Sequence, residues 1–558
     1  MEIFCTNTGE YVTANGGESL LEIYDRVKDQ IHATTPGFNP IGAHVNNKGK
    51  SLNYVVYGPR QVEFFDSVSP SGTRVYVRSL CMIMCKAVSD LFPGTHLRIE
   101  HPVSQGYFCT LSGEDINDEI IEKIAERMRQ IIAEDIAFER LERLTTDVAE
   151  EFRAKGMDDK VSLLEDSDEL YTVYYRLGDF IDTFYGDLAP STGYITVFNL
   201  IPYKTGMLLL SQDTENPTQA FEPTVQDCMF DAFTRYQQFN TILGLRDVAS
   251  LNKAVRENHT AMLINVVECL HHTYLSDIAS EIVKRYHERG CRVVLIAGPS
   301  SSGKTTTSRR LAVHLATKLI TPKVIELDNY FVNRDCTPRD ENGELDFESL
   351  YALDLDQFNT DINRLIAGEE VRLPTYNFET GKREYRGNTL RLDHGDILLL
   401  EGIHGLNPEL TKGIHDDKKF LVYVSALTTL CIDNHNWIPT SDTRLLRRII
   451  RDIKYRAQSA ADTIRRWPSV RRGENKWIFP FQENADATFN SSLLFEIAVL
   501  RNQALAALKK VPRNAPEYTT ASRLMNMLSY FREIPDADIP NSSLLREFLG
   551  GSVFEKWG

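Results

Sequence analysis

The sequence lacks any apolar run of the length that a membrane-spanning helix requires. Its uninterrupted apolar stretches, such as 293–297, fall far short of the ~18 residues needed to cross a bilayer. The first ten residues, MEIFCTNTGE, contain neither a basic region nor a long apolar region, so no secretory signal is expected. We therefore expect a cytoplasmic protein without a membrane partner.

The cysteines do not follow the spacing of a disulfide framework or of a metal site. The nine cysteines are scattered and odd in number, the closest pair is Cys81 and Cys85, and no CxxC pair occurs. A disulfide framework and a cysteine-based zinc site both fit such spacing poorly. Reduced thiols in a cytosol fit best.

An excess of positive charge is also absent. The 558 residues include 62 basic and 78 acidic side chains, which give a net charge of −16. This balance argues against a nucleic-acid coat or an anionic membrane surface as the main partner. Apolar residues make up 42% and charged residues 25%, so the composition is that of an ordinary globular protein. The length suggests about three to four domains.

No solenoid repeat and no long proline- or serine-rich linker is present, so domain boundaries come from changes in pattern. Helical patterns cover 20–31, 78–91, 116–144 and 230–288, whereas 171–212 is rich in aromatic and β-branched residues and is expected to contain strands. The expected units are a small α+β module at 1–66, a second domain at 67–245, a helical connection at 246–289, an α/β domain at 290–500 and a helical tail at 501–558.

From residue 291 the pattern changes to alternating strands and helices. Four short apolar runs, at 291–297, 323–328, 396–402 and 419–425, are typical of buried parallel strands, and helical segments lie between them. This alternation predicts a doubly wound α/β domain with a parallel sheet.

The most specific motif is GPSSSGKT at 298–305, which matches G-x-x-x-x-G-K-[ST] between an expected strand and an expected helix. The backbone N–H groups of such a loop and the helix N-terminus can surround phosphate oxygens. Lys304 can reach the β- and γ-phosphates, and the Thr305 hydroxyl can bind Mg²⁺. The alternative is a Gly/Ser-rich turn that binds nothing, which the full motif in its full context disfavours.

Two acidic residues stand where the carboxyl ends of expected strands would meet. Asp328 closes the run IELD, where a carboxylate could take the proton of an attacking hydroxyl or bind Mg²⁺. Glu401 closes the run ILLLE, a Walker-B-like place for a metal- or water-binding carboxylate. The alternatives are a helix-cap or turn aspartate and an ordinary strand-end acid.

A basic helical segment lies within the same domain. Arg444, Arg447, Arg448 and Arg451 follow the spacing i, i+3, i+4, i+7, which places them on one face of a helix. These arginines would repel one another unless an anion lay among them. We therefore expect a lid that closes on the transferring phosphates. A solvated charged face and a nucleic-acid-binding surface are the alternatives.

Residues 290 to about 495 resemble the uridine kinase and phosphoribulokinase family of P-loop kinases. The matching segments are GPSSSGKTT, LDNYF, ALD at 352–354, PTYNF at 374–378, LLLEGIHGL, DTRLLRRIIRD and NADATFN at 484–490. The resemblance implies an ATP- and Mg²⁺-dependent enzyme that transfers the γ-phosphoryl group to a hydroxyl of a nucleoside or a sugar phosphate.

The motifs and the resemblance together assign site roles to particular residues. The catalytic residues implied are Lys304, Asp328, Arg447 and Arg451. The nucleotide-binding residues implied are Gly298, Pro299, Ser300, Ser301, Ser302, Gly303, Lys304, Thr305, Thr306, Arg444 and Arg448. The acceptor-binding residues implied are Asp328, Tyr330, Tyr376, Phe378 and Arg456, and the Mg²⁺ ligands implied are Thr305, Asp328 and Glu401.

Three positions depart from the uridine kinase pattern. Uridine kinases usually read P-x-Y-D-[FY] followed by a base-binding histidine, but here Asn377 replaces the aspartate and Gly381 the histidine. Tyr351 stands where they carry a ribose-binding aspartate. The string YNFETG looks more like the phosphoribulokinase version. The sequence therefore supports phosphoryl transfer to a hydroxyl well, whereas it does not support uridine in particular as the acceptor.

The front half resembles parts of threonyl-tRNA synthetase. Residues 1–66 are similar to its TGS module through AHVNNKGKSL, and residues 74 to about 212 to its editing domain through KAVSDLFPG, HPVSQGYF and GDLAPSTG. The four polar positions of the family's editing site fall here on Arg78, Met82, Phe184 and Leu188. None of these is a usual zinc ligand, so we expect a scaffold or binding module that neither edits nor binds zinc.

The sequence thus predicts an α/β kinase of small molecules with a nucleoside-like acceptor. The first alternative is a sugar-phosphate kinase. The second is a tRNA- or nucleotide-sensing regulatory protein whose ATP site only switches conformation. A small-molecule acceptor is the expected partner, and tRNA binding by the front half and a homo-oligomer are left open.

Overall fold

In the computed structural model, which describes residues 1–113, 116–341 and 343–556, the chain begins with a small α+β module. A five-stranded sheet in the order β2-β1-β7-β4-β5 shares its core with α1 (Leu20–Thr34). Ser19 and Glu22 exchange side-chain and backbone hydrogen bonds in a capping box that fixes where α1 begins. The strands are β1 (Glu2–Cys5), β2 (Glu10–Thr13), β3 (Glu18–Ser19), β4 (Pro40–Val45), β5 (Lys48–Lys50), β6 (Val55–Val56) and β7 (Gln61–Asp66).

The second region packs α2 (Pro70–Leu91) and α3 (Asp118–Ala133) on a four-stranded antiparallel sheet, in the order β13-β14-β9-β8. A second sheet, in the order β10-β11-β12, packs with α4 (Thr145–Ala154) and α5 (Asp158–Glu165). The strands are β8 (Leu97–Val103), β9 (Gly106–Leu111), β10 (Glu139–Leu144), β11 (Tyr171–Leu177), β12 (Phe180–Asp182), β13 (Phe198–Tyr203) and β14 (Gly206–Ser211).

One helix of this region is shorter than the sequence pattern predicted. The prediction of a single helix over 116–144 is wrong, because α3 ends at Ala133 and residues 139–144 form β10. The segment ERLERL is mostly exposed, so its charged side chains are as compatible with a solvated edge strand as with a solvated helix face. Its pairing with all of β11 decides the outcome.

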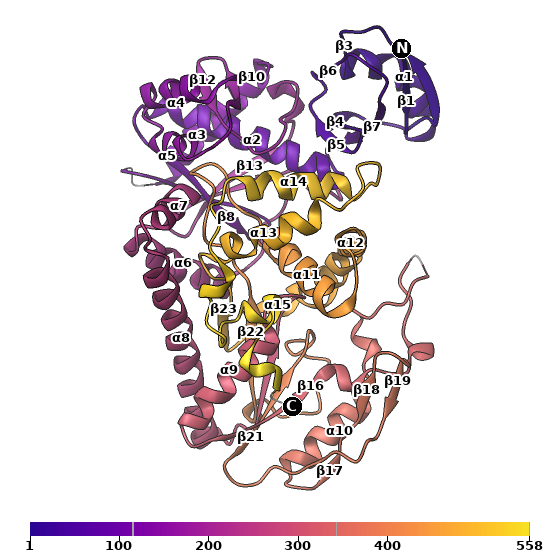
Figure 1. Ribbon diagram of the computed structural model, residues 1–558, viewed down its shortest axis with the longest axis vertical. Coiled ribbons are helices and arrows are strands. Elements are labelled where there is room, and N and C mark those ends of the chain that lie inside the picture. The colour runs from indigo at the N-terminus through magenta and orange to yellow at the C-terminus, as the bar shows by residue number, and fades with distance from the viewer. Residues whose placement is uncertain (114–115, 342, 557–558) are drawn as a thin grey trace.

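Three helices lead from the second region to the parallel sheet: α6 (Asp227–Ile242), α7 (Val248–Arg256) and α8 (Thr260–Arg289). Figure 1 shows α8 running along one side of the molecule between these two parts. It ends at Gly290, which adopts a left-handed conformation with φ 69°.

The predicted parallel sheet is confirmed and has the strand order β16-β21-β15-β22-β23. All four neighbouring pairs are parallel. The strands are β15 (Val293–Ala297), β16 (Thr321–Glu326), β21 (Asp396–Glu401), β22 (Lys419–Ser425) and β23 (Ala487–Asn490). The sequence did not predict β23, because ATFN is too short and too polar to stand out.

Both faces of this sheet are covered, as a doubly wound fold requires. Alternate residues of β15 point to opposite sides. Val294 and Ile296 join the core formed with α8 and α9 (Lys304–Thr317), whereas Val293 and Leu295 join the core formed with α10 (Leu355–Ile366). Two small antiparallel two-stranded sheets flank this second core: β17 (Val371–Arg372) with β20 (Thr389–Leu390), and β18 (Thr375–Asn377) with β19 (Lys382–Glu384).

The C-terminal residues form part of the core of the α/β domain, although the sequence suggested an appended tail. Leu524, Met527, Leu544 and Phe548 are fully buried in the same hydrophobic cluster as β15 and α8. The helices are α11 (Thr440–Arg456), α12 (Ala460–Trp477), α13 (Glu496–Leu508), α14 (Tyr518–Ser529) and α15 (Arg546–Leu549).

A buried ionic network fastens the second region to the loop between β22 and α11. Lys160 Nζ lies 2.7 Å from Asp182 and 3.0 Å from Asp433, and His435 Nδ1 lies 2.7 Å from Asp182. Lys160, Asp182 and Asp433 are each at most 1% exposed. A buried charge that loses its partner is costly, so the network holds the two parts in one arrangement.

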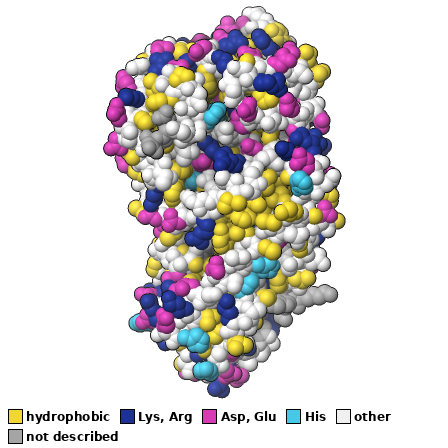
Figure 2. Space-filling model, turned by 90° about the vertical axis from the view of Figure 1, so that its left-hand side faces the viewer, with side chains coloured by type: hydrophobic (Ala, Val, Ile, Leu, Met, Phe, Trp, Pro, Cys, Tyr) yellow, Lys and Arg dark blue, Asp and Glu magenta, His cyan; other side chains and the backbone are white. Residues whose placement is uncertain are grey.

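The molecular surface shows no single-sign field on the face drawn in Figure 2, where acidic and basic side chains are interspersed around a hydrophobic cluster. Within the described residues, none of the helices combines the length and the apolar character that crossing a bilayer would require.

Candidate active site at the carboxyl edge of the parallel sheet

The phosphate loop joins β15 to α9 and is packed tightly on both sides. A Cβ atom on Gly298 would lie 2.0 Å from the carbonyl oxygen of Val424. A Cβ on Gly303, which has φ +84°, would lie 2.7 Å from the side chain of Leu544. Both positions of the motif therefore require glycine.

Lys304 and Thr305 begin α9 and face the end of the sheet. Lys304 is 8% exposed, and its Nζ donates to the carbonyl oxygen of Pro299 at 3.2 Å. The Thr305 hydroxyl donates to Glu401 Oε2 at 3.3 Å. The structure thus brings the predicted Walker-type threonine and the predicted strand-end acid into contact.

The acids gather beside Lys304 because of strand register. Glu401 is paired with Ile296 of β15 and with Glu326 of β16, and Asp328 follows β16 in a 3-10 turn, η2 (Leu327–Tyr330). Burial, helped by the charge of Glu326, raises the pKa of Asp328 to about 6, and Lys304 opposes this rise. Burial also raises the pKa of Glu401 to about 7, again against the charge of Lys304.

The donor set fits Mg²⁺. Thr305 offers a hydroxyl, and Glu401 and Asp328 offer carboxylates, which are the hard oxygen ligands that Mg²⁺ prefers. The charges of Asp328 and Glu326 raise the pKa of Glu401, so these acids repel one another when all are ionised. A divalent cation among them would remove that repulsion.

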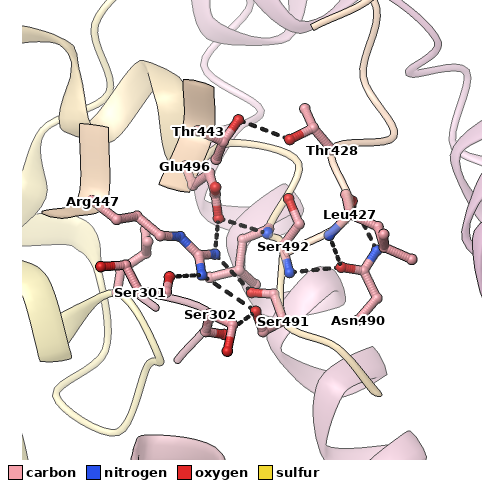
Figure 3. A network of polar contacts seen from close by, with 12 residues as sticks. Ser301, Ser302, Leu427, Thr428, Thr443, Arg447, Asn490, Ser491, Ser492 and Glu496 are labelled. Atoms are coloured by element: carbon pink, nitrogen blue, oxygen red, sulfur yellow. Dashed lines mark hydrogen bonds and ion pairs between the residues drawn. The ribbon is translucent and has the colours of Figure 1, made fainter. Parts of the chain in front are cut away.

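The arginine helix α11 lies against the phosphate loop. Arg444 Nε donates to the carbonyl oxygen of Ser300 at 3.0 Å, and Arg448 Nη1 donates to Ser300 Oγ at 2.8 Å. Arg447 Nη1 donates to the carbonyl oxygen of Ser301 at 3.4 Å, and Figure 3 shows its guanidinium between that loop, Ser491 and Glu496. These contacts brace the loop through two carbonyl oxygens and one hydroxyl oxygen and leave its N–H groups to other partners.

Carboxylates of the chain itself neutralise these arginines. Glu474 of α12 is paired with Arg444, and Glu496 of α13 with Arg447. Arg444 is 1% exposed and Arg447 0%, so this part of the helix is not a solvated charged face. The anions that the sequence required among the arginines are therefore present before any phosphate binds.

The other half of the arginine face is less enclosed. Asp452, which is fully buried, lies 3.3 Å from Arg448, 3.2 Å from Arg451 and 3.5 Å from Arg456. The Arg456 side chain is 51% exposed, and its charge lowers the pKa of Asp328. Arg456 thus lies near Asp328 while about half of its side chain stays exposed.

The predicted acceptor aromatics take different environments. Tyr330 is fully buried and donates to Asp361 of α10 at 3.2 Å, so it belongs to the core beneath the site. Tyr376 is 4% exposed and Phe378 is 59% exposed, and their ring centroids lie 5.0 Å apart. Phe331, which the sequence did not single out, packs edge-on against both rings.

Sequence reasoning missed Glu348, which lies near Lys304, Asp328 and Arg448. Burial and the charge of Glu474 raise the pKa of Glu348 to about 7. Its Oε2 is buried and has no hydrogen-bond partner in the described part of the chain. A Cβ on Gly473 would lie 2.4 Å from Glu348 Cβ, so this glycine lets the acid reach its place. The position of Glu348 just before the ALD segment, one of the segments shared with the kinase family, could have indicated this residue from the sequence.

In the editing-like region, the four positions where the family carries polar site residues hold side chains that pack into the core or bond to the backbone. Met82 and Leu188 are fully buried and Phe184 is 6% exposed, all within the core of that region. Arg78 Nη2 donates to the carbonyl oxygen of Asp187 at 3.0 Å. Apolar side chains therefore occupy three of the four positions, which gives water no polar group there to bind.

Comparison with known proteins confirms the resemblance predicted from the sequence. The sequence model of the Phosphoribulokinase / Uridine kinase family matches residues 293–497. The uridine kinase of Geobacillus kaustophilus is 29% identical over 195 residues, which are 35% of this chain and 83% of that protein. The threonine–tRNA ligase of Fusobacterium nucleatum is 31% identical over 163 residues, and similarity of this kind lies in the N-terminal part. The chain spans about a quarter of the length of the threonine–tRNA ligases it matches.

Solved structures of kinases are also similar to this chain. A putative fructose transport system kinase from Silicibacter sp. TM1040 has 16% identity and a TM-score of 0.29, over 38% of this chain and 98% of that one. A possible uridine kinase from Bacillus stearothermophilus has 21% identity and a TM-score of 0.25, over 36% of this chain and 89% of that one.

Proposed function

We propose that this chain is a Mg²⁺- and ATP-dependent kinase that transfers the γ-phosphoryl group to a hydroxyl of a neutral, nucleoside-like or polyol acceptor. One observation carries the proposal: the phosphate loop, Lys304, the Thr305–Glu401 contact and Asp328 converge at one edge of a parallel sheet. Ligands bind at this edge in open α/β folds, and a motif that only made a turn would not need the two acids.

Phosphoryl transfer needs little covalent chemistry from the protein, so positioning and charge do most of the work. Lys304 places an ammonium beside the transferring phosphoryl group. Thr305, Glu401 and Asp328 would hold Mg²⁺, which neutralises charge on the β- and γ-phosphates when bound. Arg456 has the exposure and position to approach the same phosphates on closure.

Asp328 acts as the general base. With a pKa raised to about 6 by burial, its carboxylate is mostly ionised at neutral pH and can still bind a proton as the acceptor hydroxyl attacks. The same raised pKa makes it a better base than an exposed aspartate, because the ideal catalytic pKa lies near the working pH.

The acidic character of the acceptor side favours a neutral acceptor over a sugar phosphate. The charge of Asp328 raises the pKa of both Glu348 and Glu401, and Glu348 Oε2 and Tyr376 Oη, which lack hydrogen-bond partners within the described residues, can bond hydroxyl groups. The nearby Arg448 and Arg456 are both paired with Asp452. A second phosphate would add negative charge among carboxylates, whereas hydroxyl groups would satisfy them.

An acceptor screen tests the proposal. Purified full-length protein, ATP and Mg²⁺ are incubated with nucleosides, free sugars or sugar phosphates, and ADP formation above the no-acceptor rate is measured. Acceptor-dependent turnover with a neutral compound, lost in Lys304→Ala, is expected. Turnover confined to sugar phosphates would contradict the acceptor class, and acceptor-independent ATP hydrolysis would contradict the kinase.

A regulatory role of the ATP site is the second candidate, and contacts between the front half and α11 favour it. Asp442 in the first turn of α11 is paired with Arg523 of α14, and Thr519 of α14 donates to the carbonyl oxygen of Asn47 in the N-terminal module at 3.0 Å. A ligand of the front half could act on the arginine helix through these contacts. Nucleotide affinity that changes with tRNA, without any acceptor turnover, would favour this function.

A further inference from the structure

The phosphate loop is closed by an acid from the far end of the chain. The backbone N–H of Thr306 donates to Glu547 Oε2 at 3.1 Å. Thr306 is the second residue after Lys304, in the first turn of α9, where a loop of this type presents its N–H groups to the α- and β-phosphates of a nucleotide. The carboxylate of Glu547 therefore occupies a position that a phosphate oxygen would take.

The segment that carries Glu547 is firmly docked. Leu544 packs against Gly303 of the loop and is fully buried, as is Phe548, whose ring centroid lies 5.1 Å from the Arg447 guanidinium. Lys454 of α11 donates to the carbonyl oxygen of Leu549. The backbone on either side of Glu547 is thus part of the core, and rotation of the Glu547 side chain is the movement that would free the N–H.

Two acids bond N–H groups of the loop region, but only one of them is held by cations. Glu474 accepts from the N–H of Ser300 at 3.1 Å and is clamped by Arg444 and Arg471, at 0% exposure. Glu547 is partly exposed and makes no ion pair within the described residues. Its charge instead raises the pKa of Glu401, an acid of the expected metal site. Glu474 is therefore held in place by two cations, whereas Glu547 lies near an acid, Glu401, that repels it.

We propose that Glu547 is an internal substitute for a nucleotide phosphate, which stabilises the empty loop and must swing away before a nucleotide binds. This inference rests on the proposed function of the site, because it requires that the loop bind a nucleoside phosphate. Nucleotide binding would replace the Glu547 carboxylate by a phosphate at the same N–H group. The free energy needed to displace the carboxylate therefore weakens the measured nucleotide affinity. The C-terminal segment thereby sets how readily the kinase accepts its nucleotide.

The expected thermodynamic signature has two parts. If only a fraction of the molecules hold the N–H free, the apparent dissociation constant is raised by the inverse of that fraction. Removing the carboxylate removes this penalty and also removes a stabilising contact from the empty protein. The same variant should therefore bind nucleotide more tightly and have a slightly lower Tm in the empty form.

The test compares Glu547→Gln, Glu547→Asp and a matched control, Glu555→Gln, in the full-length chain. Glu555 lies on the same segment and accepts from the Tyr455 hydroxyl at 2.8 Å, away from the loop. Calorimetric titration with ADP, with and without Mg²⁺, should show affinity about tenfold tighter for Glu547→Gln, the size expected when a charge-assisted hydrogen bond no longer has to be broken. Glu547→Asp, one methylene shorter, should behave similarly, and Glu555→Gln should match the wild type.

The outcomes separate this inference from the proposed function. Unchanged or weaker ADP affinity in both Glu547 variants, with wild-type binding intact, would overturn the phosphate-substitute role alone. A loss of affinity seen only with Mg²⁺ would also overturn it, because Glu547 would then act as a metal ligand. Absence of ADP binding in the wild type and in every folded variant would overturn the proposed function and this inference with it.

Discussion

Replacement of Asp328 by asparagine tests the base assignment most specifically. The amide keeps the size of the side chain, but it cannot accept the proton of the acceptor hydroxyl. Because it is neutral, it also does not repel the neighbouring carboxylates of Glu326 and Glu401. General-base catalysis contributes about 10²–10⁴-fold, so kcat of Asp328→Asn should fall by a factor in that range. Affinity for ADP without Mg²⁺ should stay within a few-fold, because Asp328 contacts no atom of the phosphate loop in the described hydrogen bonds.

The pH dependence supplies the second half of this test. Because the pKa of Asp328 in the unliganded protein is about 6, kcat/KM of the wild type should be half-maximal near pH 6 and fall about tenfold for each pH unit below it. The folded-state pKa lies above the ordinary value, so the contribution of this group to the free energy of unfolding grows as pH falls through 6. A loss of activity below pH 6 can therefore not be explained by unfolding caused by protonation of Asp328.

A coupled assay of ADP release between pH 5 and 8, with Tm measured at each pH, checks both points. Varying the substrate concentrations at each pH gives kcat and kcat/KM separately. A wild-type profile that stays flat down to pH 5, or a kcat of Asp328→Asn within twofold of the wild type, would refute the base assignment.

Four further substitutions have distinct expected results. Lys304→Ala should abolish transfer with an unchanged circular dichroism spectrum, because the ammonium neutralises phosphate charge and packs little; measurable transfer near the wild-type rate would contradict this. Arg447→Ala should lower the free energy of unfolding by about 3–5 kcal/mol, since it leaves a buried carboxylate unpaired. Arg456→Ala should instead lower kcat with little change in Tm. Chemical denaturation and kinetics measure these effects, and a destabilised Arg456→Ala beside a stable Arg447→Ala would be inconsistent with the burial of the two arginines. Lys160→Met should lower the free energy of unfolding by a similar 3–5 kcal/mol, because two buried aspartates lose their cation; an unchanged denaturation midpoint would argue against the ionic network.

Local sequence signals predicted the parallel part of the fold well, because a buried parallel strand is a short, continuous apolar run. They also located Lys304, Thr305 and Glu401, since a motif fixes spacing along the chain and strand register does the rest. The C-terminal part of the helix expected over 116–144 was wrong for the opposite reason. An exposed charged segment carries no periodicity that distinguishes an edge strand from a helix face, and pairing with β11 decides it.

The acids that complete the site were out of reach of local reasoning. Glu474, Glu496 and Glu547 are all distant in sequence from the phosphate loop, and Glu474 and Glu496 lie 30 and 49 residues from Arg444 and Arg447, with which they pair. The charge pattern of α11 showed that anions were needed, but it could not show that the chain supplies them. Tertiary contacts of this kind become visible only once the C-terminal segment is placed in the core.

Transfer of the γ-phosphoryl group of labelled ATP to a neutral, hydroxyl-bearing acceptor is the most direct test of the proposed kinase. Full-length protein is incubated with Mg²⁺, γ-labelled ATP and the best acceptor from the screen, with Lys304→Ala as the matched control. We expect label in a new phosphate ester of the acceptor, formed in proportion to ADP and absent with the variant. Label found only in inorganic phosphate, or equal transfer by Lys304→Ala, would contradict the proposed function.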